Sequence, residues 1–259
     1  MIFETHAHYD DEAFDVDRDK ILKLCYEEKV YPVINAAVNG KTCEATLKLT
    51  REYPFVYGVL GFHPSDAADY NDEERDLLRQ RCLSSDKILG IGEIGLDYHY
   101  DEPDREIQKE VFISQLKLAR ELSLPVVIHS RDAAKDTMDI IKEYGADLSG
   151  VIHCYSYHLK DALEYVKMGY YIGVGGVLTF KNAHKLREVV EGIPIERILL
   201  ETDSPYLAPV PYRGKRNCSL YLTFVADALA EMKGISREEA ERITFDNAVR
   251  LFGIKDIQI

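Results

Sequence analysis

The sequence predicts an α/β protein folded as a single (β/α)8 barrel, the TIM-barrel architecture. Three observations point to this fold. The chain has 259 residues, close to the roughly 250 that one such barrel takes. Short apolar runs alternate with amphipathic stretches, as strands and helices do in parallel βαβ units. Metal-capable side chains end many of these runs, and the strand ends of a barrel share the face that carries the active site.

Eight short runs rich in aliphatic and β-branched residues are the expected strands. They centre near Phe3, Ile34, Val56, Ile91, Val127, Ile152, Ile172 and Leu199. The runs at 125–128 and 151–152 are continuously apolar, which is typical of strands buried on both faces. An open doubly wound sheet also fits alternating elements. A barrel is favoured because no GxGxxG follows the first strand and the metal-capable residues recur around the whole order.

Helices are predicted between the strands, and the clearest of them spans Asp104–Leu122, with its apolar residues on one side. The stretches 161–168 and 183–191 have a similar pattern. Gly145, Gly169 and Gly192 are expected to cap helices before the next strand.

The tail from Asn217 onward is expected to be all helical. Ser236 opens a capping box for a helix through Phe245, and 246–253 is expected to be a separate short helix with a glycine stop. No linker or repeat is visible, so residues 1–259 are expected to form one domain.

The overall charge limits the classes of function. The formal net charge is -13, which argues against broad nucleic-acid coating, because that needs a basic face. A small site whose charge is inverted by metal ions remains compatible with nucleic acid. No signal segment is expected at the N-terminus, and no apolar run approaches the roughly 18 residues of a membrane span. Its five scattered cysteines suit reduced thiols. We therefore expect a cytoplasmic protein with no membrane span and no obligate protein partner.

Six side chains form the predicted metal set, and each closes an apolar run. They are His6, His8, Glu93, His129, His153 and Asp203. His6 and His8 alternate on one strand and therefore face the same way. Glu93 has two carboxylate oxygens and can bridge two cations. The set therefore predicts two divalent ions per chain. Mixed nitrogen and oxygen ligands suit Mg²⁺, Mn²⁺, Zn²⁺ or Ni²⁺.

Other residues are expected to act on the substrate. Asp203 is in place to ligate a metal and to take a proton from a bound water, and Glu201 beside it to orient a ligand. His63 closes a further apolar run and is expected to contact substrate. Arg131 is a natural anion partner near His129. Arg213 and Lys215 belong to a compact basic loop after the last strand, which suggests an anionic substrate.

Taken together, the strand-end motifs described above and the segments around them resemble the TatD family of metal-dependent deoxyribonucleases, among the amidohydrolase-like metallohydrolases. The resemblance covers nearly the whole chain. Its segments are 5–10, 58–64, 92–98, 108–112, 125–131, 153–156, 176–182, 200–209, 212–217 and 247–252.

The resemblance implies that His6, His8 and Asp203 hold one ion, that His129 and His153 hold the other, and that Glu93 bridges them. It also implies that His63 contacts the scissile phosphate, and that the enzyme is cytoplasmic. The implied activity is hydrolysis of DNA phosphodiesters, as a 3′-to-5′ exonuclease on a short footprint of single-stranded DNA. Asp203 is then the expected general base, and Glu93 and His63 are the other expected catalytic residues. The two ions are expected to activate a water molecule and to bind the attacking and leaving oxygens.

Two positions depart from the family pattern. Cys218 and Ser219 stand where the family usually has Glu-Pro, which concerns a loop near the substrate. Tyr157 and His158 stand where a small glycine is usual, so that a bulky ring is expected either to narrow the site or to stack on a base.

Two other functions stay open. One is a barrel amidohydrolase acting on a small amide, lactone or ester with the same metals. Many such enzymes bridge their ions with a modified lysine on the fourth strand, where this chain has Glu93. The other is a metal-bound binding module without turnover.

Overall fold

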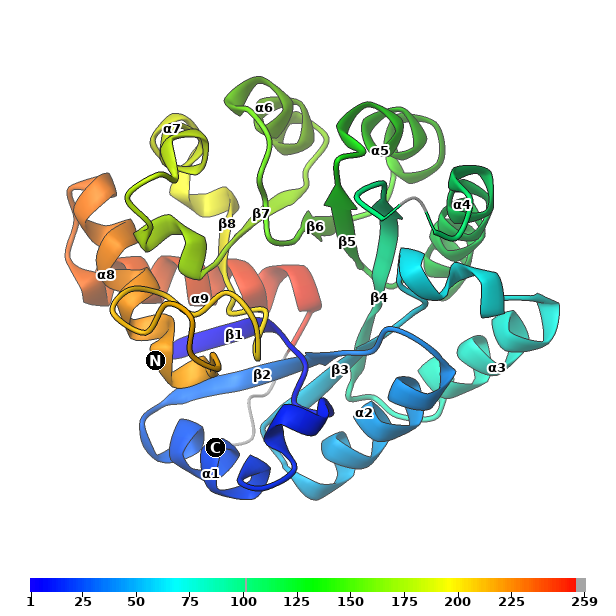
Figure 1. The fold of residues 1–259 in the computed structure, drawn as a ribbon, viewed down its shortest axis with the longest axis horizontal. Coiled ribbons are helices and arrows are strands. Elements are labelled where there is room, and N and C mark those ends of the chain that lie inside the picture. Colours follow the sequence, from blue (N-terminus) through cyan, green and yellow to red (C-terminus); the bar gives the residue numbers. More distant parts are fainter. Residues whose placement is uncertain (101, 255–259) are drawn as a thin grey trace.

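The computed structural model describes residues 1–100 and 102–254, so residue 101 and the last five residues of the predicted domain lie outside the described part. Eight parallel strands alternate with helices around a barrel (Figure 1). The strands are β1 (Ile2–Ala7), β2 (Val30–Ala36), β3 (Val56–Leu60), β4 (Ile88–Asp97), β5 (Val126–Arg131), β6 (Gly150–Ile152), β7 (Tyr171–Val174) and β8 (Ile198–Leu200). The predicted (β/α)8 class and all eight strand positions are confirmed.

Helices cover the outside of the barrel (Figure 1). They are α1 (Arg18–Glu27), α2 (Gly40–Glu52), α3 (Asp72–Leu83), α4 (Arg105–Leu122), α5 (Ala134–Ile140), α6 (Leu159–Lys167), α7 (His184–Gly192), α8 (Leu222–Lys233) and α9 (Arg237–Phe252). The short helices are η1 (Glu12–Phe14), η2 (Pro64–Asp69), η3 (Ile141–Gly145), η4 (Gly176–Thr179), η5 (Ile195–Arg197) and η6 (Ser219–Tyr221).

Each strand pairs in parallel with the next one along the chain, from β1 to β8. The barrel closes where β1 meets the segment after β8. There the backbone N–H of Asp203 donates to the carbonyl of His6 at 2.9 Å, and the N–H of His8 donates to the carbonyl of Ser204 at 2.8 Å. The closure therefore joins the first and last predicted ligand segments directly.

The inside of the barrel forms a core of its own. Phe3, Val59, Val127 and Leu199 from different strands belong to one buried cluster that also contains Leu251 of α9 and its neighbours. Stacked rings join the two parts, since the Phe3 and Phe252 centroids lie 6.0 Å apart. The C-terminal helix thus packs against the amino-terminal part of β1, away from the strand ends that carry the predicted ligands.

Two glutamines of α4, one heptad apart, hold the backbone of two strand ends. The buried Gln115 amide accepts from the N–H of Phe62 at 2.8 Å and donates to its carbonyl at 3.0 Å. Gln108 does the same for Asp97, at 2.8 and 3.0 Å. The helix therefore fixes the backbone next to His63 and at the end of β4.

Two local predictions were wrong. The tail does not break near Phe245, because α9 runs unbroken to Phe252. Asn247, expected in a separate helix, instead lies within α9, where its buried amide donates to the carbonyls of Ile195 and Ile198. Gly145 and Gly192 are the last residues of η3 and α7 and do not cap them, since the caps are Ala146 and Ile193. Gly169, with a positive φ, directly follows Met168, the cap of α6.

Candidate metal centre

The first group of candidate ligands is positioned by the barrel closure. The Nε2 atoms of His6 and His8 lie 3.2 Å apart. Asp203 Oδ1 lies 3.3 Å from Nε2 of His8 and 3.7 Å from Nε2 of His6. The three side chains offer ligand atoms close enough to share one ion. Alternation along β1 turns both imidazoles inward, as the sequence predicts, and the backbone bonds to Asp203 bring the carboxylate to them.

The second group comes from β5 and the end of β6. His129 Nδ1 lies 3.2 Å from His153 Nε2. These two strands are neighbours in parallel register, with Ile128 opposite Ile152, so the two following histidines emerge side by side. The structure thus brings together the pair that the two strand ends predict.

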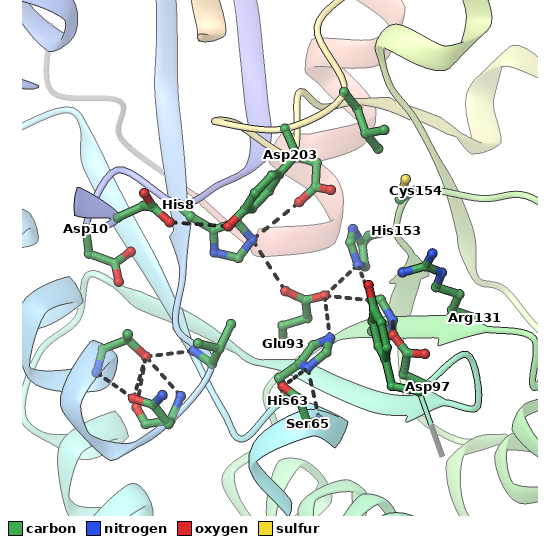
Figure 2. A pocket seen from close by; sticks show the side chains of 18 of the residues that line it. His8, Asp10, His63, Ser65, Glu93, Asp97, Arg131, His153, Cys154 and Asp203 are labelled. Atoms are coloured by element: carbon green, nitrogen blue, oxygen red, sulfur yellow. Dashed lines mark hydrogen bonds and ion pairs between the residues drawn. The ribbon is translucent and has the colours of Figure 1, made fainter. Parts of the chain in front are cut away.

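Glu93 lies between the two groups, and its two oxygens face different ones (Figure 2). Oε2 lies 3.3 Å from His6 Nε2 and 3.5 Å from His8 Nε2. Oε1 lies 2.9 Å from His129 Nδ1 and 2.7 Å from His153 Nε2. This is the arrangement that a bridging carboxylate requires.

A close backbone approach next to Glu93 depends on glycine. Gly95 has a φ of +143°, and a Cβ there would collide with the carbonyl oxygen of His129. The same residues pair across β4 and β5. Only glycine therefore lets β4 lie close enough to β5 for Glu93 to reach His129.

Two of the nitrogens that face away from the centre have hydrogen-bond partners, whereas Nδ1 of His6 and Nδ1 of His153 have none among the described residues. His8 Nδ1 lies 2.9 Å from the carbonyl of Ala36, and its N–H donates there. His129 Nε2 lies 3.1 Å from Asp97 Oδ2. Such outer partners fix the tautomer and orient a metal-binding imidazole. Asp97 is not among the residues predicted from the sequence, although it ends the same strand as Glu93, four residues later.

His63 stands at the edge of the second group. Its Nδ1 accepts the backbone N–H of Ser65 at 3.1 Å, so a neutral ring carries its proton on Nε2. Nε2 lies 3.7 Å from Glu93 Oε1. Burial and the neighbouring His129 lower the pKa of His63 to about 3. The ring is therefore a neutral donor facing the centre.

The charged groups of the cluster shift one another's pKa values. Burial by itself disfavours the ionised carboxylate of Glu93, but His153 and His6 hold its pKa well below the usual range. Burial would lower the pKa of His8, yet Asp203 and Glu93 outweigh it and raise the pKa to about 10. Asp97 and Glu93 likewise outweigh burial at His129 and raise its pKa to about 9. The raised pKa values of His8 and His129 thus follow from the carboxylates that surround them.

The donor set fits divalent metal ions. Nitrogen ligands lie about 2.0–2.1 Å from zinc, so two atoms on one ion are separated by roughly 3.0–3.4 Å. The 3.2 Å between the ligand nitrogens of each histidine pair falls in this range. The spacing of both pairs therefore matches two nitrogens on one ion. The residues are candidates for two sites joined by Glu93.

A cavity of about 1190 Å³ opens above the centre. His63, Arg131 and Asp203 line it, together with Asp10 and Asp11 on the β1 side. Arg131 is exposed, and its guanidinium lies 5.4 Å from the ring centre of Tyr100.

Arg213 and Lys215 do not line this cavity. The guanidinium of Arg213 instead lies 4.5 Å from the ring centre of Phe180, beside η4. The structure therefore brings Arg131 to the centre but places the predicted basic loop to one side of it.

The two departures from the family pattern have structural roles. The Tyr157 hydroxyl accepts the N–H of Ala133 at 3.1 Å and lies 2.9 Å from Ser130 Oγ. It braces the end of β5, and Tyr157 does not line the cavity. Ser219 is buried and accepts the Tyr9 hydroxyl at 2.8 Å, in the core behind β1. Neither of the two roles expected for Tyr157 matches this position.

The barrel with a histidine and carboxylate cluster at its strand ends is that of a metal-dependent hydrolase. A family model described as TatD related DNase matches residues 3–253. The chain belongs to the TatD family, as the sequence motifs predict. Among the described residues, no helix has the length and apolar character needed to cross a membrane.

Relatives of similar length support this membership. The metal-dependent hydrolase YabD of Bacillus subtilis is 42% identical over 98% of this chain and all of its own. YcfH of Escherichia coli K12, also described as a metal-dependent hydrolase, is 36% identical over 98% of this chain and 96% of its own. The crystal structure of YjjV, a TatD homologue from E. coli K12, superposes with a TM-score of 0.91 at 30% identity, covering 98% of both chains.

Proposed function

We propose that this protein is a metal-dependent deoxyribonuclease that hydrolyses phosphodiester bonds, as a 3′-to-5′ exonuclease on single-stranded DNA. The observation that carries the proposal is the position of Glu93, whose oxygens face the two ligand groups separately. A carboxylate between two cation sites is typical of two-metal phosphoryl hydrolysis. The family's description as DNases supports DNA as the substrate.

The proposed centre holds two divalent ions, drawn from Mg²⁺, Mn²⁺, Zn²⁺ or Ni²⁺. His6, His8 and Asp203 hold one, His129 and His153 the other, and Glu93 both. When bound, the ions supply a water of lowered pKa and neutralise charge on the phosphate. We further propose that residues 1–259 act as one catalytic domain in the cytoplasm, on a short single-stranded footprint.

The chain's own residues then divide the remaining work. Asp203 is in place to take the proton of the attacking water, because its carboxylate is partly open to the cavity whereas His6 is fully buried. His63 donates its Nε2–H to a phosphate oxygen. Arg131, which lines the same cavity, neutralises charge on the same phosphate. Hydrolysis in the 3′-to-5′ direction leaves a nucleotide with a 5′-phosphate.

A matrix of metals and substrates tests the proposal. Mg²⁺, Mn²⁺ and Zn²⁺ are supplied to the metal-stripped protein with 5′-end-labelled single- and double-stranded DNA and RNA, beside a panel of amides and lactones. A ladder shortened from the 3′ end of single-stranded DNA is expected. Asp203→Asn should abolish it, whereas Asp15→Asn, an exposed residue of the same cavity, should not. Full activity of Asp203→Asn, or turnover of amides alone, would overturn the assignment.

A further inference from the structure

A second cavity, of about 420 Å³, adjoins the metal centre. It lies between the loop after β6, η4, the start of α7 and the segment after β8. Four residues line both cavities, namely Cys154, Ser156, Asp203 and Leu207. The two cavities are therefore adjacent at these residues. The volume of the second cavity is within the range of small-ligand pockets.

The lining combines apolar walls with polar groups that lack partners. Val177, Leu186 and Leu207 supply apolar surface. Glu201 is 1% exposed and lines the cavity, and its Oε2 atom has no hydrogen-bond partner among the described residues. On the opposite side begins α7, whose N-cap residue Ala183 provides no side-chain bond to the first turn. One unpaired carboxylate oxygen and the uncapped first turn of α7 thus border an apolar slot, which suits a small ligand with apolar faces and polar edges.

The charges favour approach from this side. The β1 wall of the metal cavity carries four carboxylates, Asp10, Asp11, Glu12 and Asp15. The second cavity has Lys185 at its edge, and Arg213 lies over Phe180, which directly follows η4. A polyanion is repelled by the first wall and attracted to the second. Arg213 of the basic loop therefore lies beside η4, on the side of the second cavity, whereas Arg216 of the same loop pairs with Asp17.

We propose that the second cavity is a nucleobase subsite, which seats the base of the nucleotide next to the scissile phosphate. This inference rests on the proposed nuclease function. A nucleobase is flat, has apolar faces and carries donors and acceptors on its edges, as the lining requires. The base in the cavity and the phosphate at the metal centre then belong to one nucleotide unit. Binding at the subsite sets KM, while the metal centre sets the chemical step.

A substitution that fills the second cavity tests whether base binding and the chemical step are separated in this way. Val177→Trp places an indole in the apolar slot. Leu83→Trp is the control, because Leu83 is 62% exposed at the end of α3, near the opposite face of the barrel. The substrates are a single-stranded oligonucleotide and the same strand with abasic residues on both sides of the scissile phosphate. Stacking and burial of one base correspond to about a tenfold change in KM or more.

The expected result is a KM raised by about tenfold for the intact strand in Val177→Trp, with no change for the abasic strand and none in the control. Bound metal should be the same in all three proteins. Equal losses on both strands, or no loss on either, would overturn the subsite. Cleavage of neither strand by the unsubstituted protein with any metal would instead refute the proposed nuclease function.

A binding measurement keeps the inference testable if Val177→Trp does not fold. The chain has no tryptophan, so Asn182→Trp at the exposed rim gives a single fluorescent reporter. Titration with deoxyadenosine monophosphate should quench its emission saturably, and Leu83→Trp should show no such response. Absence of quenching in Asn182→Trp would contradict base binding at this cavity, independently of any activity.

Discussion

The carboxylate of Asp97 holds His129 from behind, with 3.1 Å between Oδ2 and the Nε2 atom that faces away from the centre. The opposite nitrogen of the same ring lies 2.9 Å from Glu93. Backbone bonds from Gln108 in turn fix Asp97 itself. The second group of candidate ligands is thus oriented by a chain of contacts that leads from α4 through β4 to the imidazole.

Replacement of Asp97 by Asn should weaken metal binding at the second group about 10–100-fold, because the outer carboxylate orients the ring and raises its basicity. Competition with a fluorescent chelator measures the affinity. Asp132→Asn is the matched control, since Asp132 is exposed and contacts His99 instead. Unchanged affinity in Asp97→Asn would show that His129 does not need this partner.

Replacement of Glu93 by Gln should reduce bound metal and lower hydrolysis by about 100-fold or more, because several kcal/mol of charge stabilisation depend on the ions. The fold should persist, which circular dichroism checks. Glu12→Gln removes an exposed carboxylate from the same cavity and should retain activity. Two ions still bound at full occupancy to the Glu93→Gln variant would contradict the bridging role.

Metal uptake should release protons at neutral pH. The pKa of His8 is raised to about 10 and that of His129 to about 9 in the metal-free protein, so both rings are protonated at pH 7. A ligand nitrogen must lose its proton before it binds. Apparent affinity should therefore rise as pH increases from 7 towards 9. Calorimetry in buffers of different ionisation enthalpy counts the protons, and a pH-independent affinity would refute the linkage.

Replacement of Gln115 by Leu should lower the free energy of unfolding by about 2–4 kcal/mol, because the N–H and carbonyl of Phe62 lose their buried partners. Urea unfolding measures the change. Gln80→Leu, an exposed site on α3, should be nearly neutral. Similar stability of the two variants would mean that the strand end is held by packing alone.

Much of this fold follows from local sequence patterns. Runs such as 125–128 are apolar on both faces because β5 is covered inside and outside the barrel. The ends of those runs located all six candidate ligands, since parallel strands of a barrel end at one face. His129 and His153 lie side by side for this reason alone, without any signal that links them along the chain.

Other contacts depend on tertiary geometry that no local pattern contains. Asp97 was missed because its function arises from a cross-strand contact with His129. The break expected near Asp246 was wrong because Asn247 finds buried acceptors at Ile195 and Ile198, which overrides its weak helix propensity. Arg213 was predicted to bind the substrate from its charge alone. Its position over Phe180 depends on the path of the long segment after β8, which no local pattern contains.

Among the described residues, the packing of α9 against the barrel interior closes the end of the barrel that lies opposite the ligands. Phe3 and Leu251 belong to a continuous apolar plug below the ligands, so nothing can pass through the barrel from one end to the other. Substrate and product must therefore both pass through the face of the barrel that carries the ligands.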